Sequence, residues 1–358
     1  MSCERNTRVL FCWSRISGYM SACWRELSAQ PGVDLRALAW NVSSTQEQAE
    51  FSESIAEGFD CRLLEPEERF DFNLLASEAK AFSPDIVVIS GWHSPAYVRL
   101  VKQLRPVVKR VIMCIDTPWQ QRAKQRLTRF RHASLLRRVD DVFVAGERSW
   151  QYARQLGFAE PNIHRGLYAW DESTFAPVAQ AREASADWPR RFLYVGRYAE
   201  EKGIVNLLEA YQRYREKSAD PWPLRCCGSG PLQHLVNAAD GVEDKGFVQP
   251  ADLPDMLRES GVFVLPSHYE PWGVALAEAM GAGLPAIATN ACGAGIDLIR
   301  NGWNGHLIAT SSSSALADAM IEMEDSVTQI AEMGRRASVA AEPFTSRNWA
   351  VRWAGLLT

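Results

Sequence analysis

The chain reads Val262-Phe-Val-Leu-Pro266 and shortly afterwards Glu270-Pro-Trp-Gly-Val-Ala-Leu-Ala-Glu278. The apolar run predicts a buried parallel strand. The alanine- and leucine-rich segment after Gly273 predicts a helix. Glu270 is therefore expected in a strand-to-helix loop, and Glu278 about one turn inside the helix. Such a unit indicates an α/β fold, in which ligands bind beyond the carboxyl ends of strands, and a helix N-terminus suits a phosphate or an oxygen-rich ligand.

Further motifs of the same kind surround this unit in order. Upstream, the predicted strand Phe192-Leu-Tyr-Val-Gly196 runs into Arg197, and Lys202-Gly203 begins the next helix. Another strand enters the turn Gly228-Ser-Gly230, and Gly293-Ala-Gly295-Ile-Asp297 and Asn301-Gly-Trp-Asn-Gly305 follow downstream. Taken singly, the two glutamates and the two cations would be interpreted as solvated surface charges, so the order and spacing of the set carry the functional interpretation.

From about Phe192 to Leu307 this ordered set resembles the retaining glycosyltransferases of family 4, which have the GT-B fold. The resemblance implies two doubly wound Rossmann-like domains with parallel sheets facing a central cleft. It also implies a C-terminal helix that crosses back to the first domain. Trp272 and Asp297 depart from the family, in which Phe and Glu are usual at those positions.

Strands that alternate with helices along the whole chain favour two such domains. In the first half we expect strands at 9–13, 35–40, 61–64, 85–90, 111–116 and 141–145, and in the second half at 192–196, 224–227, 246–248, 262–266 and 285–289. We expect an acceptor-binding domain over 1–175, a linker over 176–190, a nucleotide-sugar-binding domain over 191–340 and a returning C-terminal helix over 341–358.

The cations Arg197 and Lys202 are the predicted diphosphate clamp. Transfer from a nucleotide sugar places growing negative charge on the leaving diphosphate, which fixed cations and helix N-termini can stabilise. Arg grips two phosphate oxygens with its planar fork, and Lys supplies a compact charge.

The resemblance assigns the remaining donor contacts. It implies that Glu278 accepts hydrogen bonds from the ribose hydroxyls and that Glu270 approaches the hydroxyls of the donor sugar. The backbone amides near Gly273 and Val274 would lie beside it. Val248 would lie against the base, and Gly228 would permit close approach of the backbone, although turn geometry alone also explains that glycine.

Three residues of the first half are candidates on the acceptor side. Gly18 follows the first strand, where the family has a glycine loop that touches phosphate, although a turn explains it equally well. Asp116 stands at a strand end where many family members have histidine. It either orients the acceptor or stabilises positive charge at the anomeric carbon, or it only caps a loop. His93 is a second candidate, or a structural histidine.

The sequence contains no Asp-x-Asp pair and no Cys/His cluster, so we expect no metal and no cofactor beyond the donor substrate. The net charge of −4 gives no drive toward nucleic acid. No apolar run approaches the ~20 residues that span a bilayer, and the first residues, 1–8, lead into a strand rather than a secretory signal. With eight scattered cysteines and no Cys-x-x-Cys, the expected location is the cytoplasm.

A basic segment, 122–138, interleaves cations with apolar residues. It predicts a partly amphipathic helix, which either lies on anionic lipid at the inner face of the membrane or is a solvated charged helix or a rim for an anionic acceptor.

These observations together favour a retaining, metal-independent glycosyltransferase that uses a nucleotide diphosphate sugar and a glycan or lipid-linked acceptor. The alternatives are a GT-B sugar-nucleotide epimerase and a catalytically inactive donor-binding subunit.

Overall fold

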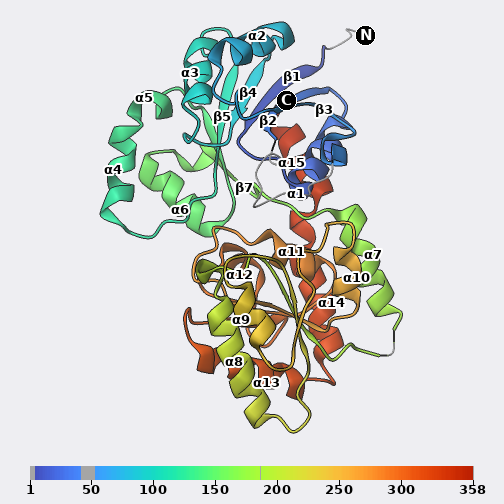
Figure 1. The fold of residues 1–358 in the computed structure, drawn as a ribbon. Helices are drawn as coiled ribbons and strands as arrows, with labels where there is room; N and C mark the ends of the chain where they lie inside the picture. The colour runs from blue at the N-terminus through green and yellow to red at the C-terminus, as the bar shows by residue number, and fades with distance from the viewer. Residues whose placement is uncertain (1–4, 42–52, 186, 358) are drawn as a thin grey trace. The chain divides into compact units, whose positions relative to one another are not determined.

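The structure is a computed structural model that describes residues 5–41, 53–185 and 187–357. Contacts divide the chain into two compact units (Figure 1). The N-terminal unit comprises Met1–Ala169 and Ser346–Thr358, and the C-terminal unit comprises Trp170–Thr345. Residues 1–4 of the expected non-secretory start lie outside the described residues.

In the described part of the N-terminal unit, seven parallel strands form one sheet in the order β3-β2-β1-β4-β5-β6-β7. The strands are β1 Thr7–Trp13, β2 Val33–Trp40, β3 Asp60–Leu64, β4 Ile86–Ile89, β5 Arg110–Ile115, β6 Asp141–Val144 and β7 Ile163–Arg165. The helices are α1 Gly18–Ser28, α2 Phe72–Phe82, α3 Pro95–Leu104, α4 Ala123–Arg131, α5 Ala133–Leu136, α6 Glu147–Leu156 and α15 Ser346–Leu357. The strand order reverses between β1 and β4, so the sheet is doubly wound.

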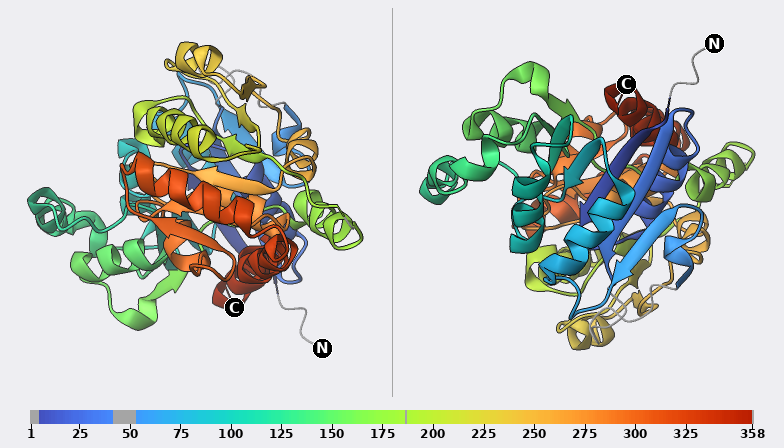
Figure 2. Two further views of the ribbon diagram at one scale, coloured as in Figure 1. Left: turned by 90° about the horizontal axis from the view of Figure 1, so that it is seen from below. Right: turned by 90° about the horizontal axis from the view of Figure 1, so that it is seen from above.

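The C-terminal helix α15 is part of the N-terminal unit, as expected, and lies beside α1 (Figures 1 and 2). Its Trp353 stacks on Phe143 of β6 at 4.4 Å between ring centroids and packs on Phe11 of β1 at 5.2 Å. The indole N–H of Trp349 donates to the Leu167 carbonyl at 2.8 Å. Both tryptophans are fully buried, and burial of large aromatic rings fixes this helix to the first sheet.

In the described part of the C-terminal unit, six parallel strands are ordered β10-β9-β8-β11-β12-β13. The strands are β8 Phe192–Val195, β9 Leu224–Cys227, β10 Val242–Asp244, β11 Val262–Leu265, β12 Ala286–Thr289 and β13 Gly305–Ile308. The helices are α7 Glu172–Glu183, α8 Ile204–Lys217, α9 Gln233–Ala238, α10 Leu253–Arg258, α11 Val274–Gly281, α12 Gly293–Leu298, α13 Ser313–Asp325 and α14 Ile330–Ala341. α8 and α13 pack side by side. Of the helices in the described ranges, none has the length and apolar character that a bilayer crossing requires.

The structure corrects two sequence-based expectations. The strand expected at 246–248 lies earlier, at Val242–Asp244, and 246–248 is a loop. The single basic helix expected over 122–138 is two helices, α4 and α5, divided at His132. The φ of −105° and ψ of 16° at His132 depart from helical values. β7 and β13 were not predicted.

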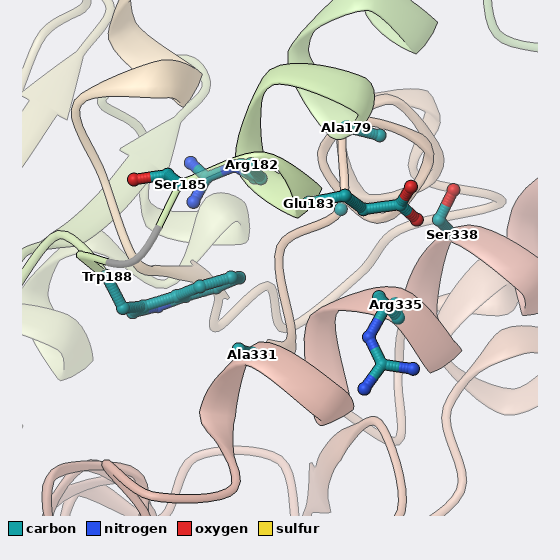
Figure 3. A pocket seen from close by; sticks show the side chains of 9 residues that line it. Ala179, Arg182, Glu183, Ser185, Trp188, Ala331, Arg335 and Ser338 are labelled. Atoms are coloured by element: carbon teal, nitrogen blue, oxygen red, sulfur yellow. The ribbon is translucent and has the colours of Figure 1, made fainter.

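Residues 172–183, which overlap the expected linker, form helix α7 in the C-terminal unit. A small hollow lies between α7 and α14, and Figure 3 shows the guanidinium of Arg182 over the ring of Trp188, at 4.9 Å. The residues that line this hollow are Ala179, Arg182, Glu183, Ser185, Trp188, Gly283, Ala331, Arg335 and Ser338. None of the predicted donor residues lines the hollow.

Candidate active site

The predicted donor residues of the C-terminal unit gather where its strand order reverses. β8 and β11 are neighbours in the sheet although two strands separate them in sequence. The loop after β8 carries Arg197 and Lys202, and the loop after β11 carries Glu270. In doubly wound sheets, ligands bind beyond the carboxyl ends of the strands at such a reversal of strand order.

Backbone contacts hold these two loops together. The amides of His268 and Tyr269 donate to the Glu201 carbonyl at 2.9 and 3.2 Å. Gly203 has a left-handed φ of 71°, and a Cβ there would lie 2.1 Å from the Pro266 carbonyl oxygen. Only glycine fits this close approach, so the Lys202-Gly203 pair fixes the position of the lysine relative to the second loop.

Both cations of the predicted clamp are paired with carboxylates. The Lys202 ammonium lies 2.6 Å from a carboxylate oxygen of Glu270, and their side chains are only 25% and 13% exposed. Arg197 pairs with Glu201 four residues on, and its side chain is 56% exposed. The structure thus joins Lys202 directly to Glu270, whereas Arg197 stands at the solvent-facing edge of the same loop.

Gly273 is the N-cap residue of α11 and lies next to this ion pair. Its φ is 102°, and a Cβ would lie 2.8 Å from Cys292 Sγ and 3.2 Å from Glu270 Cγ. The carbonyl of Trp272 accepts from the Ala294 amide at 2.8 Å, so α12 holds the turn. Because the first amides of an α-helix lack partners within the helix, the N–H of Val274 is available to an anion beside Lys202.

Packing explains Trp272, which stands where Phe is usual in the family that the sequence resembles. Its side chain is 2% exposed and packs against Phe344 at 5.1 Å between ring centroids. The ring therefore belongs to the core beneath the loop, and the chemistry of the loop depends on the neighbouring backbone and on Glu270.

Glu278 lies one turn into α11. Burial, with a smaller contribution from the nearby Asp171 carboxylate, raises the pKa of Glu278 to about 7. A carboxyl group with this pKa is neutral below pH ~7 and charged above it. Above that pH it can accept hydrogen bonds with both oxygens.

We expect nucleotide affinity to depend on this ionisation. As pH falls through about 7, protonation of Glu278 should weaken nucleoside diphosphate binding by up to about tenfold for each pH unit. Calorimetric titrations between pH 6 and 8 would measure this, with Glu278→Gln as the reference, because protonation of the ligand's own phosphate affects both proteins equally. Parallel pH profiles for the two proteins would contradict the assignment.

The glycine turn after β9 closes against the neighbouring strand ends. A Cβ at Gly228 would lie 1.9 Å from the Gly196 carbonyl oxygen, and the Gly228 amide donates to the Gly246 carbonyl at 2.7 Å. The Asp244 carboxylate accepts from the Tyr198 hydroxyl at 2.7 Å and from the Gly246 amide at 2.8 Å. The close approach of the Gly196 carbonyl therefore explains the glycine at position 228 without any ligand. Val248 lies on the loop that Asp244 holds and is partly exposed.

The acceptor candidates lie in the N-terminal unit at the ends of β1, β4 and β5. Asp116 accepts a hydrogen bond from the Tyr168 hydroxyl at 3.0 Å, and Tyr168 packs edge-on against Tyr19, the neighbour of Gly18. A Cβ at Gly18 would meet no atom within 4 Å. His93 is exposed and packs beside Trp92, which stacks on His132. Asp116 thus shares a cluster of contacts with Tyr19, the residue after Gly18, and His93 belongs to another.

Sequence reasoning missed three residues that shape these sites, namely Glu201, Asp244 and Tyr168. The spacing of Arg197 and Glu201, four positions apart at a helix start, was a usable signal. Asp244 and Tyr168 act through contacts between distant segments, for which the sequence contains no local pattern.

Comparison with known proteins agrees with this geometry. Residues 178–339 match the glycosyl transferases group 1 family and residues 21–165 match the glycosyl transferase 4-like domain. A glycogen synthase of Mycobacterium tuberculosis is 32% identical over 165 residues, which are 44% of this chain and 39% of that protein. A phosphatidyl-myo-inositol mannosyltransferase of Mycobacterium leprae is 32% identical over 185 residues, 49% of this chain and 47% of that protein.

The fold has a solved counterpart in the Anabaena protein HepE, in complex with UDP, with a TM-score of 0.75 and 16% identity over 98% of this chain and 99% of that one. The chain covers less than two thirds of the length of the curated relatives named above. The two family matches, the doubly wound sheets and the returning helix α15 together show that the chain belongs to the group 1 glycosyltransferases, family 4, with the GT-B fold.

Proposed function

We propose that this chain is a retaining, metal-independent glycosyltransferase that moves a sugar from a nucleotide diphosphate donor to a hydroxyl group. The observation that carries the proposal is the Lys202–Glu270 pair, 2.6 Å apart, beside the start of α11 at the strand-order reversal. This arrangement offers a cation and a helix N-terminus to the diphosphate and a carboxylate to the sugar.

In the proposed reaction the bond between the anomeric carbon and the diphosphate oxygen breaks, and its electron pair leaves with the nucleoside diphosphate. Arg197, Lys202 and the Val274 amide stabilise the charge that develops there. The acceptor oxygen bonds to the anomeric carbon and loses its proton to a basic group. Glu278 accepts hydrogen bonds from the ribose hydroxyls, Glu270 orients the sugar, and Val248 lies against the base.

The relatives guide the choice of donor and acceptor. HepE is a protein solved with UDP, so UDP and UDP-sugars are the first donors to test. The Mycobacterium tuberculosis relative is a glycogen synthase and the Mycobacterium leprae relative is a phosphatidyl-myo-inositol mannosyltransferase, which favours a glycan or lipid-linked acceptor. We place Gly18 near the donor phosphate and Asp116 or His93 near the acceptor. The segment 122–138 would contact an anionic membrane from the cytoplasmic side.

Two other functions remain as competitors. A sugar-nucleotide epimerase would release nucleotide from the donor without an acceptor, and an inactive donor-binding subunit would bind the donor without turnover. A product assay on the isolated chain, with and without acceptor, separates both from a transferase.

A thermal-shift screen of nucleoside diphosphates and nucleotide sugars tests the donor assignment first. A ligand at a hundred times its Kd stabilises the protein by ~2.7 kcal/mol. Lys202→Ala serves as the control, because a shift that depends on the proposed site should fall in that variant. Absence of a shift with every nucleotide, or a shift unchanged in Lys202→Ala, would contradict the site.

A further inference from the structure

Helix α4 of the N-terminal unit carries two large apolar side chains that face solvent. Leu127 is 62% exposed and Phe130 is 75% exposed, and no side chain of the helix is buried. Both residues lie on the same face because they are three positions apart. In Figure 1, α4 lies at the periphery of its unit, next to α5 and α6.

The opposite face of α4 holds the helix to the protein. The Gln125 side chain donates to the Pro118 carbonyl at 2.8 Å and accepts from the Gln120 amide at 2.9 Å. The Arg129 guanidinium lies over Gly157 at the end of α6, 3.1 Å from where a Cβ would be. With about 3.6 residues per turn, Leu127 and Phe130 lie on the side opposite Gln125 and Arg129 and therefore point away from the unit.

Cationic side chains lie on both sides of the apolar stripe that Leu127 and Phe130 form. On the helix, Arg126 lies on one side of the stripe and Lys124 and Arg131 on the other. From 117 to 139 the sequence contains seven cations and no carboxylate, in a chain whose net charge is −4. Within the described residues, no ion pair joins any of the seven to an acid.

We propose that α4 is an interfacial helix that seats Leu127 and Phe130 in the surface of an anionic phospholipid bilayer. An apolar stripe flanked by cations whose stems reach past it is the pattern of helices that lie in the plane of a membrane surface. A soluble polyanion would use the cations but would gain nothing from two exposed apolar side chains. The cations and the apolar stripe together therefore favour a bilayer over a soluble polyanion as the binding partner.

The position of α4 links this contact to the acceptor. His132, which ends α4, stacks on Trp92 at 4.9 Å between ring centroids, and Trp92 precedes His93 in the loop after β4. A bilayer bound by α4 would meet the unit next to that loop, so the acceptor hydroxyl is presented by a membrane lipid. The acceptor class rests on the proposed function, whereas docking can be measured without turnover.

Sedimentation with vesicles tests the proposal on the full chain. We expect binding to phosphatidylcholine vesicles that contain phosphatidylglycerol and weak binding to phosphatidylcholine alone. Binding should be lost at high salt, because the electrostatic screening length is shorter there. The double change Leu127→Ser and Phe130→Ser should lower the partition coefficient at least about tenfold. Neutralising Lys124, Arg126 and Arg131 to Gln should lower it by a similar or larger factor.

Matched controls remove the same kinds of side chain, apolar or cationic, outside α4. Val107→Ser with Val351→Ser removes two exposed apolar side chains of the same unit, and Lys80→Gln, Lys102→Gln and Arg213→Gln remove three exposed cations. Both controls should bind like the wild type. The proposal is overturned if the anionic vesicles do not bind, if the controls lose as much binding as the α4 variants, or if the Leu127/Phe130 variant binds normally while heparin competes fully.

Discussion

Lys202→Ala should lower kcat by about 10²- to 10³-fold, the range found when one preorganised charge that acts on a developing anion is removed. Lys202 is fixed by Gly203 and by the pairing with Glu270, so its charge requires little reorganisation when the diphosphate leaves. Arg197→Ala should lower kcat by at least about 10²-fold, because it removes the second cation assigned to the leaving diphosphate. Steady-state kinetics with saturating donor would measure both effects.

Lys217→Ala is the matched control, because Lys217 is also a lysine paired with a carboxylate of the same unit, at 2.8 Å from Asp318. It should turn over like the wild type. Near-normal kcat for Lys202→Ala would show that this residue does not act on the leaving group. An equal loss for Lys217→Ala would mean that the measurement reports general damage to the fold.

Glu270→Gln should impair transfer about 10²-fold or more, yet leave the affinity for the bare nucleoside diphosphate near the wild-type value. Glu270 pairs with Lys202 and is assigned to the sugar, so its loss removes a sugar contact and keeps the cation. Glu278→Gln should instead weaken binding of the bare diphosphate about tenfold or more, because a hydrogen bond to a charged group contributes ~1.5–3 kcal/mol.

Calorimetric titration with the diphosphate, combined with turnover of the complete donor, separates the two glutamates. Glu209→Gln, an exposed acid on α8, is the control and should change neither quantity. Equal loss of diphosphate affinity in both variants would contradict the division between sugar and ribose.

Regular, buried strands could be predicted from the sequence, and short polar ones could not. Val262-Phe-Val-Leu265 is uniformly apolar, and the structure has a strand there, β11. β7 is Ile163-His-Arg165 and β13 begins at Gly305 with a histidine beside it. Such segments become strands because a neighbouring strand offers its edge, which is a tertiary effect on propensity. The expected strand at 246–248 was displaced because Asp244 and Gly246 turn the chain there.

For the candidate site, the sequence supplied candidate residues but not the contacts between them. Glu270 and Lys202 were separate candidates, and their ion pair joins residues 68 positions apart. The pair follows from the reversal of strand order between β8 and β11. The contact between Tyr168 and Asp116 spans 52 positions and likewise has no local signature. At His132, where the basic segment divides, the ring stacks on Trp92, which is another contact between distant segments.

Proton NMR of the early product, recorded in excess chelator, tests the central claim most directly. The reaction would use the donor that the thermal-shift screen selects and an acceptor that supports turnover. A departing nucleoside diphosphate carries about three negative charges, and fixed cations with a helix N-terminus can stabilise them without a metal. We expect undiminished turnover and a product anomeric proton with the donor's configuration. An inverted product, or turnover that returns only when magnesium or manganese is added, would contradict the account.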